Sequence, residues 1–276
     1  MKRVNAFNDF KSIGNDKVTA IGMGTWGIGG YELPDHSRDR ESVKALRYGL
    51  ELGMNLIDTA EYYGAGHSEE LVGYAIKEFE REDVFIVSKV WPSHFRYEDL
   101  IKAARASSRR LGTYIDLYLL HWPNPEVPLS ETMGAMEELV DRGVIRYIGV
   151  SNFDLNLLLE AQHAMKKYEI VVNQVKYSLA DRHVERELLP YMDKEGMTLM
   201  AYTPLEKGRL ARNECLARIG DKYGKTAVQV ALNWLIWRKN VIAIPKAANV
   251  DHIKENFGAM GWRLSGEDHK ACLGCV

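Results

Sequence analysis

Short apolar segments alternate with amphipathic segments along almost the whole chain, and this alternation constrains the fold most strongly. Most of the apolar segments are nearly continuous in Val, Ile, Leu and Met. Such continuity is typical of parallel strands that are buried on both faces. The eight predicted strands cover residues 18–24, 55–58, 83–89, 115–121, 144–151, 170–177, 197–202 and 241–245.

Amphipathic helical patterns fill the intervals between these strands. In the first, Val43, Leu46 and Leu50 share one face, with Ser37 as the expected N-cap and Gly53 as the expected stop. Eight βα units in about 250 residues predict an α/β fold, a closed (β/α)8 TIM barrel. The predicted helices cover residues 38–52, 68–80, 97–111, 130–142, 154–167, 183–195, 226–238 and 251–259.

Domain organisation follows from the absence of any linker-like or low-complexity break. We therefore expect residues 1–276 to form a single domain, with short extra segments at the N-terminus and after strands seven and eight. A chain that is 46% hydrophobic and 27% charged can bury one large core. A net charge of −2 indicates neither nucleic acid nor an anionic membrane as a partner.

Targeting signals are not apparent in the sequence. The longest apolar runs, such as residues 230–237, are too short to span a membrane. The first ten residues contain basic side chains without an apolar core behind them, so no signal peptide is expected. These features predict a cytoplasmic protein.

The three cysteines are Cys215, Cys272 and Cys275. An odd count with one distant member argues against a disulfide framework. The C-x-x-C spacing of Cys272 and Cys275 is also found in redox and metal sites, but such sites need a second ligand pair or a strand-to-helix context. Neither is present near the C-terminus, so the sequence assigns this pair no role.

Glycines in "IGMGTWGIGG" (21–30) match the G-x-G-x-x-G fingerprint of a dinucleotide-binding turn. That turn requires a helix that begins at its second glycine. Here Pro34 and several turn residues follow, and no helix is expected before about residue 38. The sequence therefore predicts no Rossmann fold, although the glycines place this backbone at the mouth of the barrel, where a ligand can approach closely.

Ionisable residues end three successive predicted strands. Asp58, with Tyr63 five residues later, follows the second strand, Lys89 ends the third and His121 ends the fourth. Active sites of such barrels lie at the carboxyl ends of the strands. Each residue has a structural alternative: a loop cap for Asp58, a surface lysine, a core histidine, or one of fourteen tyrosines. Together they favour a site, because burying several polar groups is costly unless they satisfy one another.

The chemistry of these four side chains is complementary. Paired with Asp58, Lys89 would remain charged, and its ammonium would lower the pKa of Tyr63 from about 10 towards the working pH. A neutral His121 can donate a hydrogen bond to a carbonyl oxygen. Such a set can protonate a carbonyl oxygen as it becomes an alkoxide, but it does not supply a hydride.

Eight segments distributed along the whole chain carry recognisable motifs: "DTAEYYG", "VSKVWP", "DLYLLHWP", "GVSNF", "VNQVKYS", "AYTPLEKGRL", "QVALNWL" and "IPKA…KENF". In order and together, they resemble the aldo-keto reductases, and short-tailed, prokaryotic-type members in particular. The resemblance implies a barrel that binds NADPH or NADH in extended form and transfers hydride to an aldehyde or ketone. It implies that Asp58, Tyr63, Lys89 and His121 form the catalytic tetrad, with Tyr63 as proton donor.

The resemblance also implies positions for the cofactor. Ser151, Asn152 and Gln174 would hold the nicotinamide carboxamide, and Tyr202 would stack on the ring. From the residues alone, Asn152 could instead cap the following helix. Residues 203–210 would close over the pyrophosphate. The other implied contacts are Pro204, Leu205, Lys207 and Gly208 at the pyrophosphate, Lys246, His252, Glu255 and Asn256 at the adenosine, and Gly24, Thr25 and Trp26 beside the nicotinamide.

Two positions depart from the NADPH-preferring pattern. Ala247 stands where that pattern has serine, and His252 where it has arginine, while Lys246 is retained. Arginine binds phosphate with two parallel hydrogen bonds and histidine cannot. We expect NADPH as the cofactor, with NADH as a second or alternative cofactor.

The expected substrate is a small-molecule carbonyl compound. Trp26, Tyr62, Trp91 and Trp122 would form the walls of an aromatic pocket. The chain ends soon after the last predicted helix, which predicts an open, permissive site and leaves the natural substrate unidentified. The sequence does not determine the oligomeric state, and a monomer is the default expectation.

Two other functions remain as alternatives. A barrel of this kind can serve as a cofactor-binding regulatory or sensor subunit with little turnover. Lys89 could also form a Schiff base as in an aldolase. A lysine that must stay charged beside Asp58 argues against the aldolase.

Overall fold

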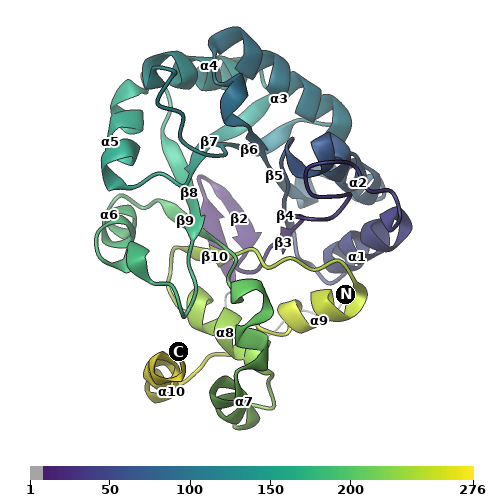
Figure 1. Ribbon diagram of the computed structural model, residues 1–276, viewed down its shortest axis with the longest axis vertical. Helices are drawn as coiled ribbons and strands as arrows, with labels where there is room; N and C mark the ends of the chain where they lie inside the picture. Colours follow the sequence, from purple (N-terminus) through teal and green to yellow (C-terminus); the bar gives the residue numbers. More distant parts are fainter. Residues whose placement is uncertain (1–8) are drawn as a thin grey trace.

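The computed structural model describes residues 9–276. Residues 1–8 lie outside this range. The prediction that no signal peptide is present, and the first eight residues of the predicted single domain, therefore fall outside the described residues. The chain folds into a curled sheet surrounded by helices (Figure 1). Eight strands pair in parallel and in chain order: β3 (Met23–Gly24), β4 (Leu56–Asp58), β5 (Phe85–Val90), β6 (Ile115–Leu120), β7 (Ile145–Ser151), β8 (Ile170–Lys176), β9 (Thr198–Tyr202) and β10 (Val241–Ala243).

Backbone hydrogen bonds join the first and last strands of this sheet. The amide of Gly22 donates to the carbonyl of Ala243 (2.9 Å), and the amide of Ala243 donates to the carbonyl of Ala20 (3.0 Å). The amide of Gly24 donates to the carbonyl of Pro245 (3.1 Å). The predicted (β/α)8 barrel is confirmed.

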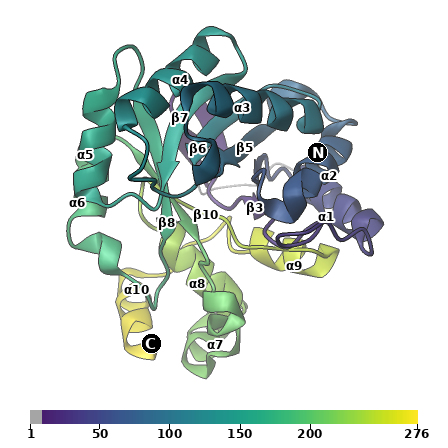
Figure 2. The same cartoon turned by 45° about the horizontal axis from the view of Figure 1, so that its top comes forward.

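Helices cover the outside of the sheet (Figures 1 and 2). In α3, Leu100, Ile101, Ala104 and Leu111 are buried against the barrel, and Gly112 ends the helix at φ 73°. Similar apolar faces attach the other helices. The outer helices are α1 (Asp39–Glu51), α2 (His67–Ile76), α3 (Tyr97–Leu111), α4 (Leu129–Asp141), α5 (Leu155–Ala164), α6 (Leu188–Lys194), α8 (Ala227–Ile236) and α9 (Val250–Phe257).

A hairpin closes the end of the barrel at which the strands begin. It consists of β1 (Phe10–Ile13) and β2 (Asp16–Thr19), which pair antiparallel. Ile13 and Val18 are fully buried and belong to the apolar cluster inside the barrel. Thr198, the first residue of β9, donates its hydroxyl hydrogen bond to the carbonyl of Ser12 (2.6 Å). Within residues 9–276, the barrel is therefore closed at this end, opposite the carboxyl ends of the strands.

The predicted first strand is divided in the structure. The start of the predicted strand 18–24 belongs to β2 of the hairpin (Asp16–Thr19), which pairs with β1. Its end, Met23–Gly24, pairs with β4 instead, so the predicted strand is shared between two sheets. The predicted helix 183–195 is also shorter, since a 3-10 turn at His183–Glu185 precedes α6. Pro190 lies in the first turn of α6, where a missing amide hydrogen is tolerated.

Of the two predicted ends of the first helix, the structure confirms the C-terminal end of α1 but not its N-cap. Gly53, at φ 94°, follows the helix as predicted. The expected N-cap Ser37 is wrong: Arg38 precedes α1 and makes no side-chain cap. The amide of Ser37 instead donates to the carboxylate of Asp35 (2.9 Å), so a local turn replaces the cap.

Two further helices lie near the C-terminus of the chain. α7 (Glu214–Asp221) lies between β9 and α8, and α10 (Gly266–Ala271) precedes a 3-10 turn at Cys272–Cys275. Cys215 forms a disulfide with Cys275, with their Cα atoms 5.4 Å apart, while Cys272 is buried and free. The expectation of no disulfide is wrong, because folding brings together residues separated by 60 positions. Within residues 9–276, no helix has both the length and the apolar character needed to cross a membrane.

Candidate active site

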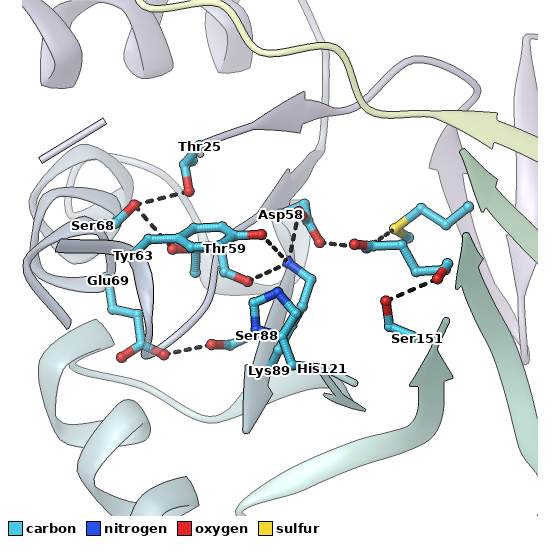
Figure 3. Close-up of polar contacts among 12 residues, drawn as sticks. Thr25, Asp58, Thr59, Tyr63, Ser68, Glu69, Ser88, Lys89, His121 and Ser151 are labelled. Atoms are coloured by element: carbon cyan, nitrogen blue, oxygen red, sulfur yellow. Dashed lines mark hydrogen bonds and ion pairs between the residues drawn. The ribbon is translucent and has the colours of Figure 1, made fainter. Parts of the chain in front are cut away.

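The four predicted catalytic side chains meet at the carboxyl ends of β4, β5 and β6 (Figure 3). Lys89 lies at their centre. Its ammonium donates hydrogen bonds to the Asp58 carboxylate (2.9 Å), the Thr59 carbonyl (2.8 Å) and the Tyr63 hydroxyl (3.1 Å). Three donors thus meet three oxygen acceptors, which satisfies the hydrogen-bonding capacity of the ammonium.

Burial makes this arrangement sensitive to charge. Lys89 is fully buried and Asp58 is 3% exposed. Burial alone would lower the pKa of Lys89, but the Asp58 carboxylate and the Tyr63 hydroxyl outweigh it, and the pKa of Lys89 is raised above its ordinary value. Lys89 therefore remains an ammonium group, as the sequence predicted.

The expected acidification of Tyr63 is wrong. Burial of the phenol is the largest influence and raises the pKa of Tyr63 above its ordinary value. The neighbouring Lys89 ammonium lowers this pKa, but it does not cancel the effect of burial. Tyr63 is consequently a protonated phenol at neutral pH, with a cation beside its oxygen.

His121 follows β6 and lies against the Tyr63 ring, with ring centroids 5.6 Å apart. Burial, assisted by the positive charge of Lys89, lowers the pKa of His121 to about 2. The imidazole is therefore neutral at physiological pH, as predicted. Its Nδ1 is buried and has no hydrogen-bond partner among the described residues.

A second group of polar side chains adjoins the tetrad. Gln174 on β8 donates from Nε2 to the Asp58 carboxylate (2.7 Å), a contact that the sequence did not suggest. Asn152 has φ 63° and donates to the His121 carbonyl (3.1 Å) and the Ser151 hydroxyl (3.0 Å). Tyr202 donates its hydroxyl hydrogen bond to the Asn152 side-chain oxygen (2.8 Å). Hydrogen bonds to Asp58 and His121 therefore connect these side chains directly to the tetrad.

The alternative role of Asn152 as a helix cap is not observed. Asp154 caps α5 instead, by accepting a hydrogen bond from the amide of Leu157 (2.9 Å). Asn152 precedes this cap, and its side chain lines the cavity described next.

A cavity of about 1210 Å³ extends from the tetrad across the strand ends. Two predicted site residues, Thr25 and Lys89, are fully buried behind its wall rather than lining it. Thr25 accepts a hydrogen bond from the Ser68 hydroxyl (2.9 Å). The predicted residues that line the cavity are Gly24, Trp26, Asp58, Tyr62, Tyr63, Trp91, His121, Trp122, Ser151, Asn152, Gln174, Tyr202, Pro204, Leu205, Lys207, Gly208, Lys246, His252, Glu255 and Asn256.

Aromatic rings surround the tetrad end of the cavity. Tyr62 stacks on Trp91 with ring centroids 3.9 Å apart and lies nearly parallel to Trp26 at 6.2 Å. Trp26 also contacts the Tyr63 ring edge-on, with centroids 4.9 Å apart. Trp26 is 42% exposed and Trp122 is 45% exposed, so this end is open to solvent.

Another part of the cavity wall contains irregular backbone, and two lysines also line the cavity. Thr203, Glu206 and Lys207 all have positive φ values (52°, 49° and 53°), which is uncommon for residues other than glycine. Lys207 and Lys246 also line the cavity, and the Lys246 ammonium lies 5.6 Å from the centre of the Tyr31 ring. Ala247, the departure noted in the sequence, is buried and does not line the cavity.

Sequence reasoning missed several residues of the cavity wall. Most of them lie in segments without helical or strand periodicity, so no pattern identified them. Basic and acidic side chains occur among them. They include Tyr31, Glu32, Arg38, Ala211 and Arg212.

Comparisons with known proteins agree on one family. The profile of the Aldo/keto reductase family matches residues 20–276. The chain is 41% identical over 261 residues to methylglyoxal reductase YeaE of Escherichia coli strain K12, covering 92% of this chain and 90% of that protein. It is 38% identical over 253 residues to a glyoxal reductase of Bacillus subtilis strain 168, covering 90% and 87%.

Solved structures give the same result. A thermostable aldo-keto reductase, Tm1743, in complex with the inhibitor epalrestat superposes with a TM-score of 0.92 at 50% identity, covering 97% of this chain and 99% of that chain. An aldo-keto reductase from Klebsiella pneumoniae in complex with NADPH has a TM-score of 0.90 at 38% identity, covering 97% and 94%.

Proposed function

The chain belongs to the aldo/keto reductase family, and we propose that it uses NADPH to reduce an aldehyde or ketone, with Tyr63 as the general acid. The observation that carries this proposal is the contact of a buried Lys89 ammonium with both the Tyr63 hydroxyl and the Asp58 carboxylate. A protonated phenol next to a fixed cation can release its proton to a developing alkoxide.

The residues of the cavity fit an extended dinucleotide. Hydrogen-bonding side chains adjoin the tetrad, as a carboxamide would require, and irregular backbone, Lys207 and Lys246 also line the cavity, as a pyrophosphate would require. NADPH, when bound, supplies the hydride. The proposed contacts are Ser151, Asn152, Gln174 and Tyr202 for the nicotinamide, with Gly24 and Trp26 beside it; Pro204, Leu205, Lys207 and Gly208 for the pyrophosphate; and Lys246, His252, Glu255 and Asn256 for the adenosine.

Each tetrad residue then has a distinct task. Tyr63 transfers its phenolic proton to the substrate oxygen, and the Lys89 ammonium stabilises the phenolate that remains. Asp58 keeps Lys89 charged. Neutral His121 donates a ring N–H to the substrate carbonyl and so orients it. The phenolate recovers its proton from solvent before the next turnover.

For the substrate we propose small aldehydes, including dicarbonyl compounds. Two relatives are named for methylglyoxal and glyoxal reduction. The aromatic walls formed by Trp26, Tyr62, Trp91 and Trp122 are open to solvent and impose few polar requirements. We further propose that residues 1–276 form one domain that acts as a monomer, since every proposed catalytic side chain comes from the same chain.

For the cofactor we propose a preference for NADPH over NADH, with NADH as a second cofactor. Lys246 supplies a cation for the 2′-phosphate, whereas His252 cannot form the paired hydrogen bonds of an arginine. A catalytic efficiency at least tenfold higher with NADH than with NADPH would contradict this preference.

The test follows NADPH absorbance with a panel of aldehydes for wild type, Tyr63→Phe and Tyr62→Phe. Tyr62 is a matched control, because it lines the same cavity without contacting Lys89. We expect Tyr63→Phe to lower kcat by about 100-fold or more and Tyr62→Phe to leave it within a few fold. An unchanged rate in Tyr63→Phe would remove Tyr63 from this role. No observation favours the regulatory-subunit alternative, which requires NADPH binding with negligible turnover in wild type.

A further inference from the structure

Two histidines and a carboxylate lie close together outside the tetrad. His36 is in the loop before α1, Asp39 is the first residue of α1 and His67 is the first residue of α2. One ligand atom from each of the three lies within 4.8 Å of the others. His67 is buried, Asp39 is half-buried and His36 is exposed, so the cluster has one fixed side and one side open to solvent.

The hydrogen bonds of His67 divide its two ring nitrogens between different partners. Nε2 lies 2.9 Å from Oδ1 of Asp39, and Nδ1 lies 2.9 Å from Oε2 of Glu70. On the other side of Asp39, Oδ2 lies 3.2 Å from Nδ1 of His36. A histidine whose second nitrogen is held by a carboxylate is the usual arrangement of a metal-binding histidine, because the carboxylate fixes the tautomer and the orientation of the ring.

We propose that His36, Asp39 and His67 bind a divalent transition-metal ion such as Zn²⁺, with Glu70 as the positioning residue of His67. Bond lengths of about 2.0–2.1 Å in a tetrahedral site place ligand atoms about 3.3 Å apart. The ring nitrogens of His67 and His36 lie 2.9 and 3.2 Å from different carboxylate oxygens of Asp39, and one ligand atom from each residue lies within 4.8 Å of the others. A small movement of the exposed His36 side chain would therefore complete the site. Water would complete the coordination. Two imidazoles select a transition metal over Mg²⁺ or Ca²⁺, which prefer oxygen ligands.

The proposed ion would stabilise one wall of the cavity. The loop that contains His36 also contains Tyr31, whose carbonyl accepts a hydrogen bond from the amide of Gly64 (2.7 Å). Tyr31 and Glu32 line the cavity described above. An ion shared by His36 and His67 would therefore connect this loop to the start of α2, at a site separate from the proposed cofactor and tetrad contacts.

The experiment is a calorimetric titration of tag-free, chelator-treated protein with ZnCl₂, followed by CoCl₂ with visible absorption as an independent readout of imidazole coordination. We expect one ion per chain with a Kd in the micromolar range or below, and no binding of MgCl₂. His36→Gln and His67→Gln should each weaken Zn²⁺ binding at least tenfold. His183→Gln is the matched control, because His183 lies 2.7 Å from the Asp181 carboxylate without being part of such a cluster.

The outcome does not depend on the proposed reductase activity, because binding is measured without substrate or NADPH. His36→Gln alters an exposed side chain and should fold, which its circular dichroism spectrum would verify. Absence of saturable Zn²⁺ binding, a stoichiometry far below one, or wild-type affinity in both His36→Gln and His67→Gln would overturn the proposal.

Discussion

Replacing Lys89 by methionine should destabilise the protein because it leaves a carboxylate in the core without its cation. Lys89 and Asp58 are 2.9 Å apart and almost inaccessible to solvent. At an effective dielectric constant of about 20, two unit charges at this distance attract each other by about 6 kcal/mol. Desolvation offsets part of this attraction, and removing one partner of a buried pair costs about 3–5 kcal/mol. We expect Lys89→Met to lower the free energy of unfolding by that amount.

The double variant Lys89→Met/Asp58→Asn separates charge from packing. Neutralising the second partner removes the unpaired charge, and the side-chain oxygen at position 58 can still accept the hydrogen bond of Gln174. We expect this variant to be more stable than Lys89→Met by at least about 1 kcal/mol, while both lack reductase activity.

Urea denaturation, monitored by circular dichroism and tested for reversibility, measures the free energies of unfolding of wild type, Lys89→Met, Asp58→Asn and the double variant. Strictly additive losses would refute the reasoning, because independent effects leave no coupling between the two charges. Activity close to that of wild type in Lys89→Met would also contradict the role proposed for this ammonium.

The other predictions concern Tyr63, His121 and the disulfide. Because the pKa of Tyr63 is raised, kcat for reduction should stay constant from pH 7 to about 9; a decline near pH 8 that Tyr63→Phe lacks would contradict this. The pKa of His121 is lowered from 6.5 to about 2 in the folded state. The contribution of the neutral imidazole to the free energy of unfolding is therefore complete above pH 6.5 and is lost as the pH falls towards 2. At pH 4 the free energy of unfolding lost through His121 amounts to about 3 kcal/mol. Urea denaturation at pH 7 and pH 4 should therefore show a smaller loss of stability in His121→Gln than in wild type. Equal losses in the two proteins would contradict this prediction. Reduction of the Cys215–Cys275 bond should lower stability by about 2–4 kcal/mol in wild type and in Cys272→Ser, but not in Cys275→Ser, as thermal unfolding with and without dithiothreitol would show. An equal effect of dithiothreitol on all three proteins would contradict that assignment.

Much of the barrel was predictable because buried parallel strands have a distinct composition. The same logic placed Asp58, Lys89 and His121 at one rim, since the carboxyl ends of neighbouring parallel strands must meet there. The direction of the Tyr63 pKa shift was not predictable, because it depends on how completely the fold excludes water from the phenol. A neighbouring charge can be inferred from sequence, whereas the extent of burial cannot.

Irregular segments account for most of the remaining differences. The loop before α1 provides Tyr31, Glu32 and Arg38 to the cavity without any periodic pattern. Cys215 and Cys275 are brought together by the packing of α7 against the end of the chain, which their separation in sequence does not indicate. Such contacts depend on tertiary structure alone.

The hairpin formed by β1 and β2 gives the barrel a floor. In the part of the chain that the structure describes, the barrel interior is filled by side chains and closed at this end, and the cavity lies at the opposite, carboxyl ends of the strands. The same cavity holds the proposed contacts of both the nucleotide and the carbonyl compound. Substrates and products would therefore enter and leave through its mouth, one after another. The order of binding and release would then depend on which bound molecule obstructs access for the others.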